Sequence, residues 1–323
     1  MSQLGIIVNP MSGRDVRRIA ARASIMTHEH KLRQVTRLVL GAAAQGVDEI
    51  LCIKDPFRIS ERAVENLPER GKVRLVDVPA THTAEDTRVA AREMWQAGCR
   101  TFIVLGGDGT NRIVASEFPD ARLLPLSTGT NNVFPYMVEA SVAGAAAGLI
   151  ATDRVNAMET CLRTKRVHIE ADGKSAIALV DAVVLQNDML GSFLPFEAEN
   201  IAALVLARAE PASIGMSPIG GFIEPCYHED DFGVIIETGE PAVHRVSAPV
   251  SAGLYGDIAI RSLRRIALDE RVHLGASGIV AFDGDRELKA TTGVDARVSR
   301  DGPWIIEPPK VMADAVRLGA FSR

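Results

Sequence analysis

Short apolar runs alternate with amphipathic stretches along the first half of the chain. A short apolar run bounded by turn residues is typical of a strand buried on both faces, whereas apolar positions three and four apart predict a helix. Their alternation predicts a mostly parallel, doubly wound sheet with helices on both faces. The expected strands are Leu4–Val8, Glu49–Ile53, Val73–Val78, Thr101–Leu105 and Arg122–Pro125. The expected helices are Arg14–Ala23, His28–Ala44, Ser60–Asn66, Ala84–Gln96, Asn111–Glu117 and Tyr136–Ile150.

The pattern changes from about residue 155 onward. Shorter apolar runs are separated by polar turns, and Asp172-Gly173 and Asp283-Gly284 are pairs that favour tight hairpins. This texture predicts a largely antiparallel, sandwich-like domain, in which we expect one clear helix, Ile201–Ala209. The expected strands are Arg166–Glu170, Ile177–Leu185, Phe232–Glu237, Val272–Leu274, Gly278–Phe282 and Ala296–Ser299, with Trp304–Glu307 and Lys310–Leu318 as a closing strand and helix.

The length of 323 residues suits two domains. We expect an α/β nucleotide-binding domain over residues 1–154 and a β-rich domain for the acceptor or for self-association over residues 155–302. Residues 303–323 are expected to return to the first domain.

Composition excludes several classes of protein. The net charge of −5 and the pI near 5.9 argue against general nucleic-acid binding. The longest apolar runs are too short to cross a bilayer, and the chain enters a strand at once without a signal peptide, so we expect a cytoplasmic protein with no membrane partner. The scattered cysteines, which form no C-x-x-C pair, are expected to be free thiols; they are Cys52, Cys99, Cys161 and Cys226.

The strongest chemical signal is the run Gly106-Gly107-Asp108-Gly109-Thr110, directly after an expected strand. Its three glycines allow a sharp turn that points several backbone N–H groups at one spot. Such a spot at the start of a helix binds phosphate. The Asp108 carboxylate beside it could hold Mg²⁺ or take a proton from an attacking hydroxyl. The structural alternative is a glycine-rich turn with a capping aspartate.

Two more polar loops follow expected strands, at the sheet edge where ligands of such folds bind. In Asn9–Gly13, Ser12 could donate to a phosphate or cap the next helix. The loop Ser127–Asn132 offers the hydroxyl, amide and backbone donors that a polyphosphate needs, although a plain polar connection is the alternative. The sequence has neither a G-x-x-x-x-G-K-[ST] nor a G-x-G-x-x-G motif, so neither of those devices holds the nucleotide.

These loops carry a family resemblance. Gly106–Thr110 resembles the signature shared by NAD kinases, diacylglycerol and sphingosine kinases and, more distantly, phosphofructokinases. Asn9–Gly13 and Thr128–Asn131 resemble loops of the lipid-kinase branch. The runs Leu126–Pro135 and Phe282–Glu287 are most similar to the NAD-kinase-like acetoin-catabolism protein X group. The resemblance spans most of the chain and implies an α/β nucleotide domain, a β-rich second domain that often mediates self-association, and a returning C-terminal tail.

The resemblance also implies residue roles. Asp108 would be the catalytic aspartate, as base or as partner of Mg²⁺. The acceptor would be bound by Asn132, Asp181 and Asp283, although Asp283 could instead be only a hairpin-turn residue. The nucleotide phosphates would be bound by Asn9, Ser12, Gly13, Gly106, Gly107, Gly109, Thr110, Thr128, Gly129, Thr130 and Asn131.

Two departures from the NAD kinases concern the acceptor pocket. Their Asn-Glu pair, which grips the adenosine of NAD, has Val180-Asp181-Ala182 as its nearest match, and the Glu is missing. Ser217–Phe222 lacks the hydroxyls and the tyrosine of the corresponding NAD-kinase segment. A site built to hydrogen-bond a ribose loses affinity when such polar partners are absent. The phosphate chemistry is retained while the acceptor pocket is altered.

The sequence therefore predicts a Mg²⁺-dependent phosphotransferase with small-molecule substrates. ATP or inorganic polyphosphate would be the donor. The acceptor would be the 2′-hydroxyl of NAD, giving NADP⁺, or a small ketol or polyol of acetoin breakdown, with a lipid as the third choice. A nucleotide-binding regulator without turnover is the alternative from another class. We expect a homo-oligomer.

Overall fold

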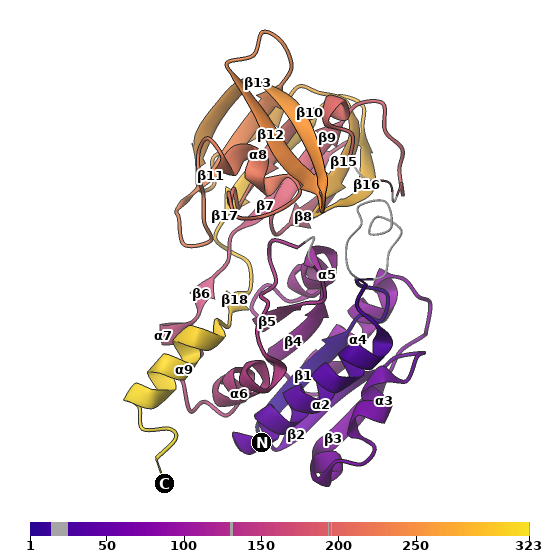
Figure 1. The fold of residues 1–323 in the computed structure, drawn as a ribbon, viewed down its shortest axis with the longest axis vertical. Helices are drawn as coiled ribbons and strands as arrows, with labels where there is room; N and C mark the ends of the chain where they lie inside the picture. Colours follow the sequence, from indigo (N-terminus) through magenta and orange to yellow (C-terminus); the bar gives the residue numbers. More distant parts are fainter. Residues whose placement is uncertain (14–24, 130–131, 193, 195, 323) are drawn as a thin grey trace.

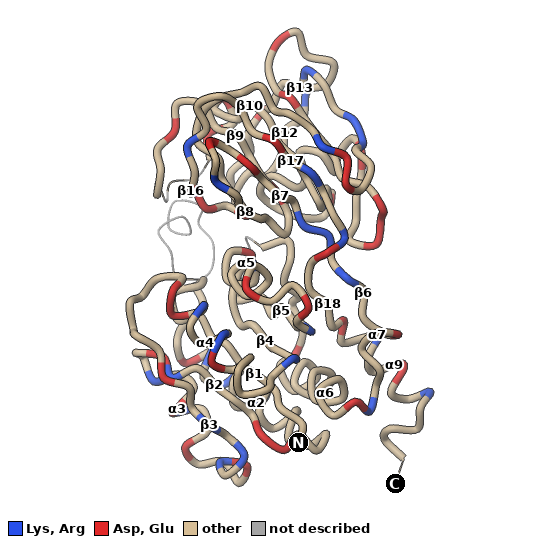
Figure 2. The backbone as a smooth tube through the Cα atoms, turned by 180° about the vertical axis from the view of Figure 1, so that it is seen from behind, with Lys and Arg blue, Asp and Glu red and all other residues tan. Residues whose placement is uncertain are grey.

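A computed structural model describes residues 1–13, 25–129, 132–192, 194 and 196–322. An α/β part and a β-rich part are stacked along the long axis of the molecule, with the first part at the bottom of Figure 1 and the second at the top. Acidic and basic residues are interspersed over both parts in Figure 2. None of the helices in the described ranges is both long and apolar enough to span a membrane.

The N-terminal sheet has seven strands in the order β3-β2-β1-β4-β5-β18-β6. Neighbouring strands are parallel except for β6, which is antiparallel to β18. The core strands are almost wholly buried, as the apolar runs predict. The strands are β1 (Gln3–Val8), β2 (Glu49–Lys54), β3 (Val73–Asp77), β4 (Thr101–Gly106), β5 (Arg122–Ser127), β6 (Leu162–Arg163) and β18 (Trp304–Ile305).

The strand order reverses direction between β1 and β4. Right-handed crossovers place the helices that precede β2 and β3 on one face and those that precede β4 and β5 on the other. This confirms the doubly wound sheet. The helices are α2 (His28–Ala44), α3 (Ile59–Val64), α4 (Ala84–Gln96), α5 (Asp108–Glu117), α6 (Ala140–Ala151), α7 (Ala157–Thr160) and α9 (Pro308–Arg317), with 3-10 turns at Pro68–Lys72 and Ala198–Asn200.

Most helix boundaries follow local signals. Helices α2 and α4 have the expected bounds, and each is capped by a threonine hydroxyl, from Thr27 and Thr83. Helix α5 starts at Asp108, three residues before the expected Asn111. Helix α6 starts at Ala140 and not at the expected Tyr136, because the Glu139 carboxylate caps it. The expected helix Arg14–Ala23 lies outside the described residues.

Two glycines let α2 and α6 approach closely. A Cβ on Gly41 would lie 2.3 Å from the carbonyl oxygen of Ser141, and one on Gly144 would lie 2.2 Å from that of Leu38. Both distances are shorter than any real contact, so only glycine fits at these two positions. This packing fixes the helical layer on one face of the sheet.

The C-terminal part is a β-sandwich. A seven-stranded sheet, β12-β13-β11-β10-β9-β15-β16, faces a four-stranded sheet, β14-β17-β7-β8, across an apolar core. A second apolar cluster, which includes the short helix α8 (Ser217–Gly221), covers the other face of the larger sheet. The strands are β7 (Arg166–Ala171), β8 (Lys174–Ala178), β9 (Asp181–Leu185), β10 (Ile201–Leu206), β11 (Phe232–Thr238), β12 (His244–Ser251), β13 (Leu254–Ala267), β14 (Val272–Leu274), β15 (Gly278–Phe282), β16 (Asp285–Ala290) and β17 (Val294–Ser299).

The structure corrects the expected helix Ile201–Ala209, which is strand β10. Ala203 and Val205 face the core between the sheets, whereas Leu204 and Leu206 face the second cluster. A strand buried on both faces is apolar at every position, and a short run of this kind has no periodicity to separate it from a buried helix. The expected strand Ile177–Leu185 is divided into β8 and β9.

The chain returns to the first sheet after the sandwich. Strand β18 pairs in parallel with β5, through Trp304 with Arg122 and Ile305 with Leu123. Figure 1 shows the yellow helix α9 beside α6, with the C-terminus below it. Glu307 of this segment accepts a hydrogen bond from the Tyr136 hydroxyl of the first part and pairs with His228 of the sandwich.

Candidate functional site

The reversal of strand order places the ends of β1 and β4 beside each other. Ligands of open α/β sheets bind beyond such strand ends. The loop Asn9–Gly13 leaves β1, and Gly107–Thr110 leaves β4 and opens helix α5. The amide Nδ2 of Asn9 donates a 2.9 Å hydrogen bond to Oγ1 of Thr110, so the two predicted phosphate loops are joined.

A cavity of about 420 Å³ lies between these loops and the sandwich. The sandwich contributes Gly215, Met216 and the turn between β15 and β16, together with Asp181 at the start of β9. Of the residues that the sequence singled out, the cavity is lined by Asn9, Ser12, Gly13, Gly107, Asp108, Gly109, Thr110, Thr128, Asn132, Asp181 and Asp283. Thr130 and Asn131 lie outside the described residues.

Asp108 is the first residue of helix α5, and its carboxylate is half-buried in the cavity wall. It accepts hydrogen bonds from the backbone N–H of Val133, at 3.1 Å, and of Phe134, at 3.0 Å. Burial and then the negative charge of Asp283 raise the pKa of Asp108 to about 7, although the two N–H donors act in the opposite direction. A carboxylate with such a pKa can exchange a proton near neutral pH.

Three aspartates share the cavity. Burial raises the pKa of Asp181 well above its usual value, and the charges of Asp283 and Asp108 raise it further. Burial also raises the pKa of Asp283, against the effect of Arg112. Oδ1 of Asp181 is buried and has no hydrogen-bond partner among the described residues. A buried acceptor oxygen without a hydrogen-bond partner in a cavity wall can accept a hydrogen bond from a ligand.

Asp283 forms part of a tight turn and also binds the backbone of a neighbouring segment. Its φ of +48°, followed by +90° at Gly284, is that of a tight hairpin turn. Its carboxylate also accepts backbone hydrogen bonds from Leu179 at 2.9 Å and from Val180 at 2.8 Å, at the break between β8 and β9. Both hydrogen bonds fix the segment that leads into Asp181.

Arg112, which the sequence reasoning missed, joins the two parts of the molecule. Its side chain is 7% exposed and lies 3.6 Å from the Asp283 carboxylate and 3.2 Å from that of Asp285, and it also pairs with Glu287. It lies one helical turn after Asp108, so a charged residue on the same face of the helix was the available signal. The Asp285 carboxylate also lies close to Gly109, since a Cβ added to Gly109 would lie 2.6 Å from Oδ2 of Asp285.

Lys31 of helix α2, also missed, is buried behind the first loop with an exposed fraction of 0%. Its Nζ donates to the carbonyl oxygens of Asn9 at 2.7 Å, Pro10 at 2.8 Å and Ser12 at 2.6 Å. The other side of the loop is also fixed, because the backbone N–H groups of Met11 and Ser12 donate to Oδ1 of Asn9, at 2.9 and 3.2 Å. The Ser12 hydroxyl itself donates to the carbonyl of Asn9, at 2.8 Å.

The third loop packs directly on the first. Gly13 has a φ of +73°, and a Cβ there would lie 2.4 Å from the carbonyl oxygen of Thr128. Oγ1 of Thr128 is buried without a hydrogen-bond partner in the described part of the chain. Gly129 and Asn132 are joined to Ser127: the Ser127 hydroxyl donates to the Gly129 carbonyl at 2.7 Å and accepts from Nδ2 of Asn132 at 3.0 Å. Gly106 lies behind the second loop, where a Cβ would meet Thr110 at 2.6 Å.

No group of three or more His, Cys, Asp or Glu side chains in the described ranges has the geometry of a metal site. The four cysteines are free and buried, as expected. The site combines the backbone N–H donors of a helix N-terminus with a carboxylate that titrates near neutrality, and such a combination can bind an anionic ligand.

Two solved structures resemble this fold. A candidate diacylglycerol kinase from Bacillus anthracis str. Sterne aligns over 96% of this chain and 98% of its own, with 13% identity and a TM-score of 0.47. An NAD kinase from Archaeoglobus fulgidus in complex with ATP aligns over 98% of this chain and 99% of its own, with 14% identity and a TM-score of 0.39. Because both identities and both TM-scores are low, we infer nothing about this protein from these two structures.

The sequence comparisons are stronger. Residues 4–155 match the model of the ATP-NAD kinase N-terminal domain, and residues 165–301 match that of the acetoin catabolism protein X C-terminal domain. Acetoin catabolism protein X of Cupriavidus necator is 36% identical over 301 residues, which cover 88% of this chain and 84% of that protein. On this evidence the chain belongs to the acetoin catabolism protein X family, whose N-terminal domain is of the ATP-NAD kinase type.

Proposed function

We propose that this protein transfers a phosphoryl group from ATP to an alcohol in the cavity between its two parts. The observation that carries the proposal is the position of Asp108, whose carboxylate lines this cavity at the start of helix α5, where backbone donors gather. A helix start with a glycine-rich turn favours a phosphate, and a carboxylate with a pKa of about 7 favours proton transfer. Inorganic polyphosphate is the alternative donor.

In this proposal the donor phosphates bind the backbone N–H groups of the loop Gly107–Thr110, and the loop Asn9–Gly13, which Lys31 holds, forms the neighbouring wall. Asn9, Ser12, Gly13, Thr128 and Gly129 complete that wall. Asp108 orients the acceptor hydroxyl and takes its proton as the oxygen attacks the terminal phosphorus. Charge that develops on the transferred group is stabilised by the same N–H donors, which is the main contribution in phosphoryl transfer.

The residues present fit a phosphate-bound Mg²⁺. Magnesium in nucleotide sites is held by one or two carboxylates together with phosphate oxygens and water, so it needs no cluster of three protein ligands. Asp108 would offer such a carboxylate oxygen in the cavity. When bound, the ion would neutralise part of the phosphate charge.

The acceptor is the open part of the proposal. The 2′-hydroxyl of NAD is the candidate that the kinase-type N-terminal domain favours. A small ketol or polyol is favoured by the name of the relative, acetoin catabolism protein X, and by the orphaned Asp181 oxygen, which suits a hydroxyl donor. We assign acceptor contacts to Asp181 and Asn132. Asp283 would support Asp181, since backbone N–H groups already bind its carboxylate.

We also propose that residues 1–154 with 303–323 form the nucleotide domain and residues 155–302 the acceptor domain. The pairing of β18 with β5 and the boundary between the two family matches support this division.

The experiment uses purified protein, Mg²⁺-ATP and NAD, with ADP and NADP⁺ followed together. Asp108→Asn should keep the fold and bind ATP but lower ADP formation by about 10²-fold or more. The matched control is Asp77→Asn, since Asp77, the last residue of β3, is 83% exposed and pairs with Lys54 at the protein surface. NADP⁺ from the wild type alone would identify NAD as acceptor.

ADP formation with acetoin or a small polyol, and no NADP⁺, would favour the second acceptor. Wild-type turnover in Asp108→Asn would overturn the role of Asp108. ATP binding without transfer to any of these acceptors would favour a nucleotide-binding regulator.

A further inference from the structure

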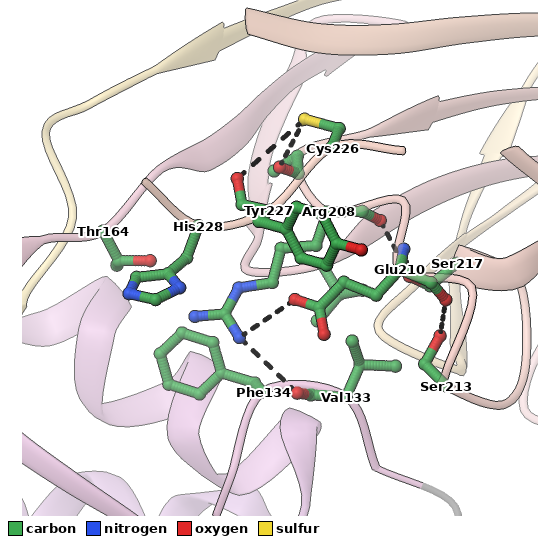
Figure 3. A network of polar contacts seen from close by, with 12 residues as sticks. Val133, Phe134, Thr164, Arg208, Glu210, Ser213, Ser217, Cys226, Tyr227 and His228 are labelled. Atoms are coloured by element: carbon green, nitrogen blue, oxygen red, sulfur yellow. Dashed lines mark hydrogen bonds and ion pairs between the residues drawn. The ribbon is translucent and has the colours of Figure 1, made fainter. Parts of the chain in front are cut away.

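Arg208 of the sandwich reaches the segment that holds Asp108 (Figure 3). It follows strand β10 and is 3% exposed. Its Nη1 lies 3.5 Å from the carbonyl oxygen of Val133, and its guanidinium carbon lies 4.8 Å from the ring centroid of Phe134. The cation therefore contacts both residues whose N–H groups bind the Asp108 carboxylate.

A single peptide group connects Arg208 to the Asp108 carboxylate. The carbonyl of Val133 and the N–H of Phe134 belong to the same planar unit. Arg208 lies at the carbonyl end, and the N–H end donates to Oδ1 of Asp108 at 3.0 Å. A positive charge at the carbonyl polarises the peptide and makes its N–H a stronger donor. The carboxylate and the cation thus interact through an aligned dipole.

The position of Arg208 is itself fixed by the cavity wall. The backbone N–H groups of Ala207 and Arg208 donate to the carbonyl of Val180, at 2.8 and 3.3 Å. The hydroxyl of Ser217 donates to the carbonyl of Arg208 at 3.0 Å. Since Val180 directly precedes Asp181, a shift of the acceptor wall would also shift Arg208.

The guanidinium of Arg208 has few hydrogen bonds. Its Nε and Nη2 are buried and have no hydrogen-bond partner among the described residues. The Glu210 carboxylate, 3.7 Å away, forms an ion pair with it but is too far for a hydrogen bond. The hydrogen bond that the guanidinium does make is the one to the Val133 carbonyl, while Glu210 balances its charge.

We propose that Arg208 is a positioning residue, which orients the Asp108 carboxylate through the Val133–Phe134 peptide and couples it to the acceptor wall. Its catalytic consequence rests on the proposed function, but the orientation of Asp108 does not. The charge of Arg208 also lowers the pKa of Asp108, against burial and Asp283. The other charged groups facing these two residues are Asp181, Asp283, Glu210, Tyr136 and, through Asp283, Arg112.

The test reads Asp108 directly. Protein labelled with ¹³C at aspartate carboxyls is titrated by NMR, and Asp108→Asn identifies the signal. Arg208→Gln should move the Asp108 midpoint up by about one pH unit. Arg208→Lys keeps the charge but loses the planar fork, so the midpoint should move by less than half as much. The control is Arg166→Gln, since Arg166 is a partly buried arginine of the same sandwich that pairs with Asp301.

An Asp108 midpoint that is equal in Arg208→Gln and wild type would overturn the proposal. So would an equal shift in Arg166→Gln, because the effect would then reflect loosening of the sandwich. If Arg208→Gln does not fold, a small upward shift of the Asp108 midpoint in Arg208→Lys would support the proposal, and an unchanged midpoint in that variant would overturn it. The titration needs no substrate, so a protein without phosphotransfer activity would leave this result readable on its own.

Discussion

The guanidinium of Arg112 and the buried carboxylate of Asp283 lie 3.6 Å apart, and this ion pair joins helix α5 to the turn between β15 and β16. The helix carries Asp108 at its first residue, and the turn supports the strand that carries Asp181. The two walls of the cavity are therefore held in register by a pair that itself lies within the cavity lining.

Arg112→Met should strongly destabilise the protein, because it leaves a buried carboxylate without its counter-charge. Breaking such a pair by removing one partner costs about 3–5 kcal/mol in the free energy of unfolding. The control Arg317→Met removes an arginine that is 78% exposed and pairs with Asp314, so it should cost less than about 1 kcal/mol. Urea unfolding followed by circular dichroism measures both. Equal losses in the two variants would contradict the role of Arg112.

Gly13→Ala and Gly173→Ala separate backbone strain from close packing. Both glycines have a φ of +73°, so each alanine is strained by about 1 kcal/mol. Gly173 has no atom within 4 Å of its Cβ position, whereas Gly13 has the carbonyl oxygen of Thr128 at 2.4 Å. We expect a similar small loss of stability in Gly173→Ala, and a further loss together with weaker ATP binding in Gly13→Ala. Thermal unfolding and calorimetric titration with ATP provide the comparison; unchanged ATP affinity in Gly13→Ala would count against the loop as a phosphate site.

Lys31→Met should loosen the first phosphate loop. It removes the donor to the carbonyls of Asn9, Pro10 and Ser12. The Asn9 carbonyl still accepts from the Ser12 hydroxyl and the Pro10 carbonyl still contacts His28, so the main loss is at the Ser12 carbonyl and costs about 1–3 kcal/mol. We expect the Kd for ATP to rise by about tenfold, since one misplaced donor costs about 1.4 kcal/mol. Lys72→Met is the control, because Lys72 is exposed and donates a long hydrogen bond to the carbonyl of Val47, at 3.3 Å. A variant that loses stability but binds ATP as the wild type does would show that Lys31 supports only the fold.

The raised pKa of Asp108 predicts how its variant responds to pH. A folded pKa of about 7, above the ordinary aspartate value of 3.8, means that the folded state binds more protons between these two pH values. The contribution of Asp108 to stability is then largest at acid pH and declines as the pH rises toward 7. Asp108→Asn avoids the charge, so its melting temperature should exceed that of the wild type at pH 8 and approach it near pH 4. A stability difference that does not change with pH would contradict the raised pKa.

Local signals predicted most of the N-terminal domain. Apolar runs gave its core strands, and the hydroxyls of Thr27 and Thr83 explain why two helices begin where they were expected. The glycine run after β4 predicted the turn and a helix close behind it, since a turn depends on backbone freedom within a few residues, although the helix begins at Asp108 and not at the expected Asn111. The strand β10 was mistaken for a helix because burial on both faces removes the periodicity that separates the two.

The sequence by itself determined the α/β and β-rich organisation and the loops after β1, β4 and β5, and it predicted Asp108 as the central carboxylate of the proposed site. Only the tertiary structure decided that Arg112, Arg208 and Lys31 lie at this site and that Asp181 has an orphaned oxygen. The physical reason is that these contacts join distant segments. Arg112 and Asp285, for example, are 173 positions apart, and no local propensity records which buried charge faces which carboxylate once the sandwich has packed onto the sheet.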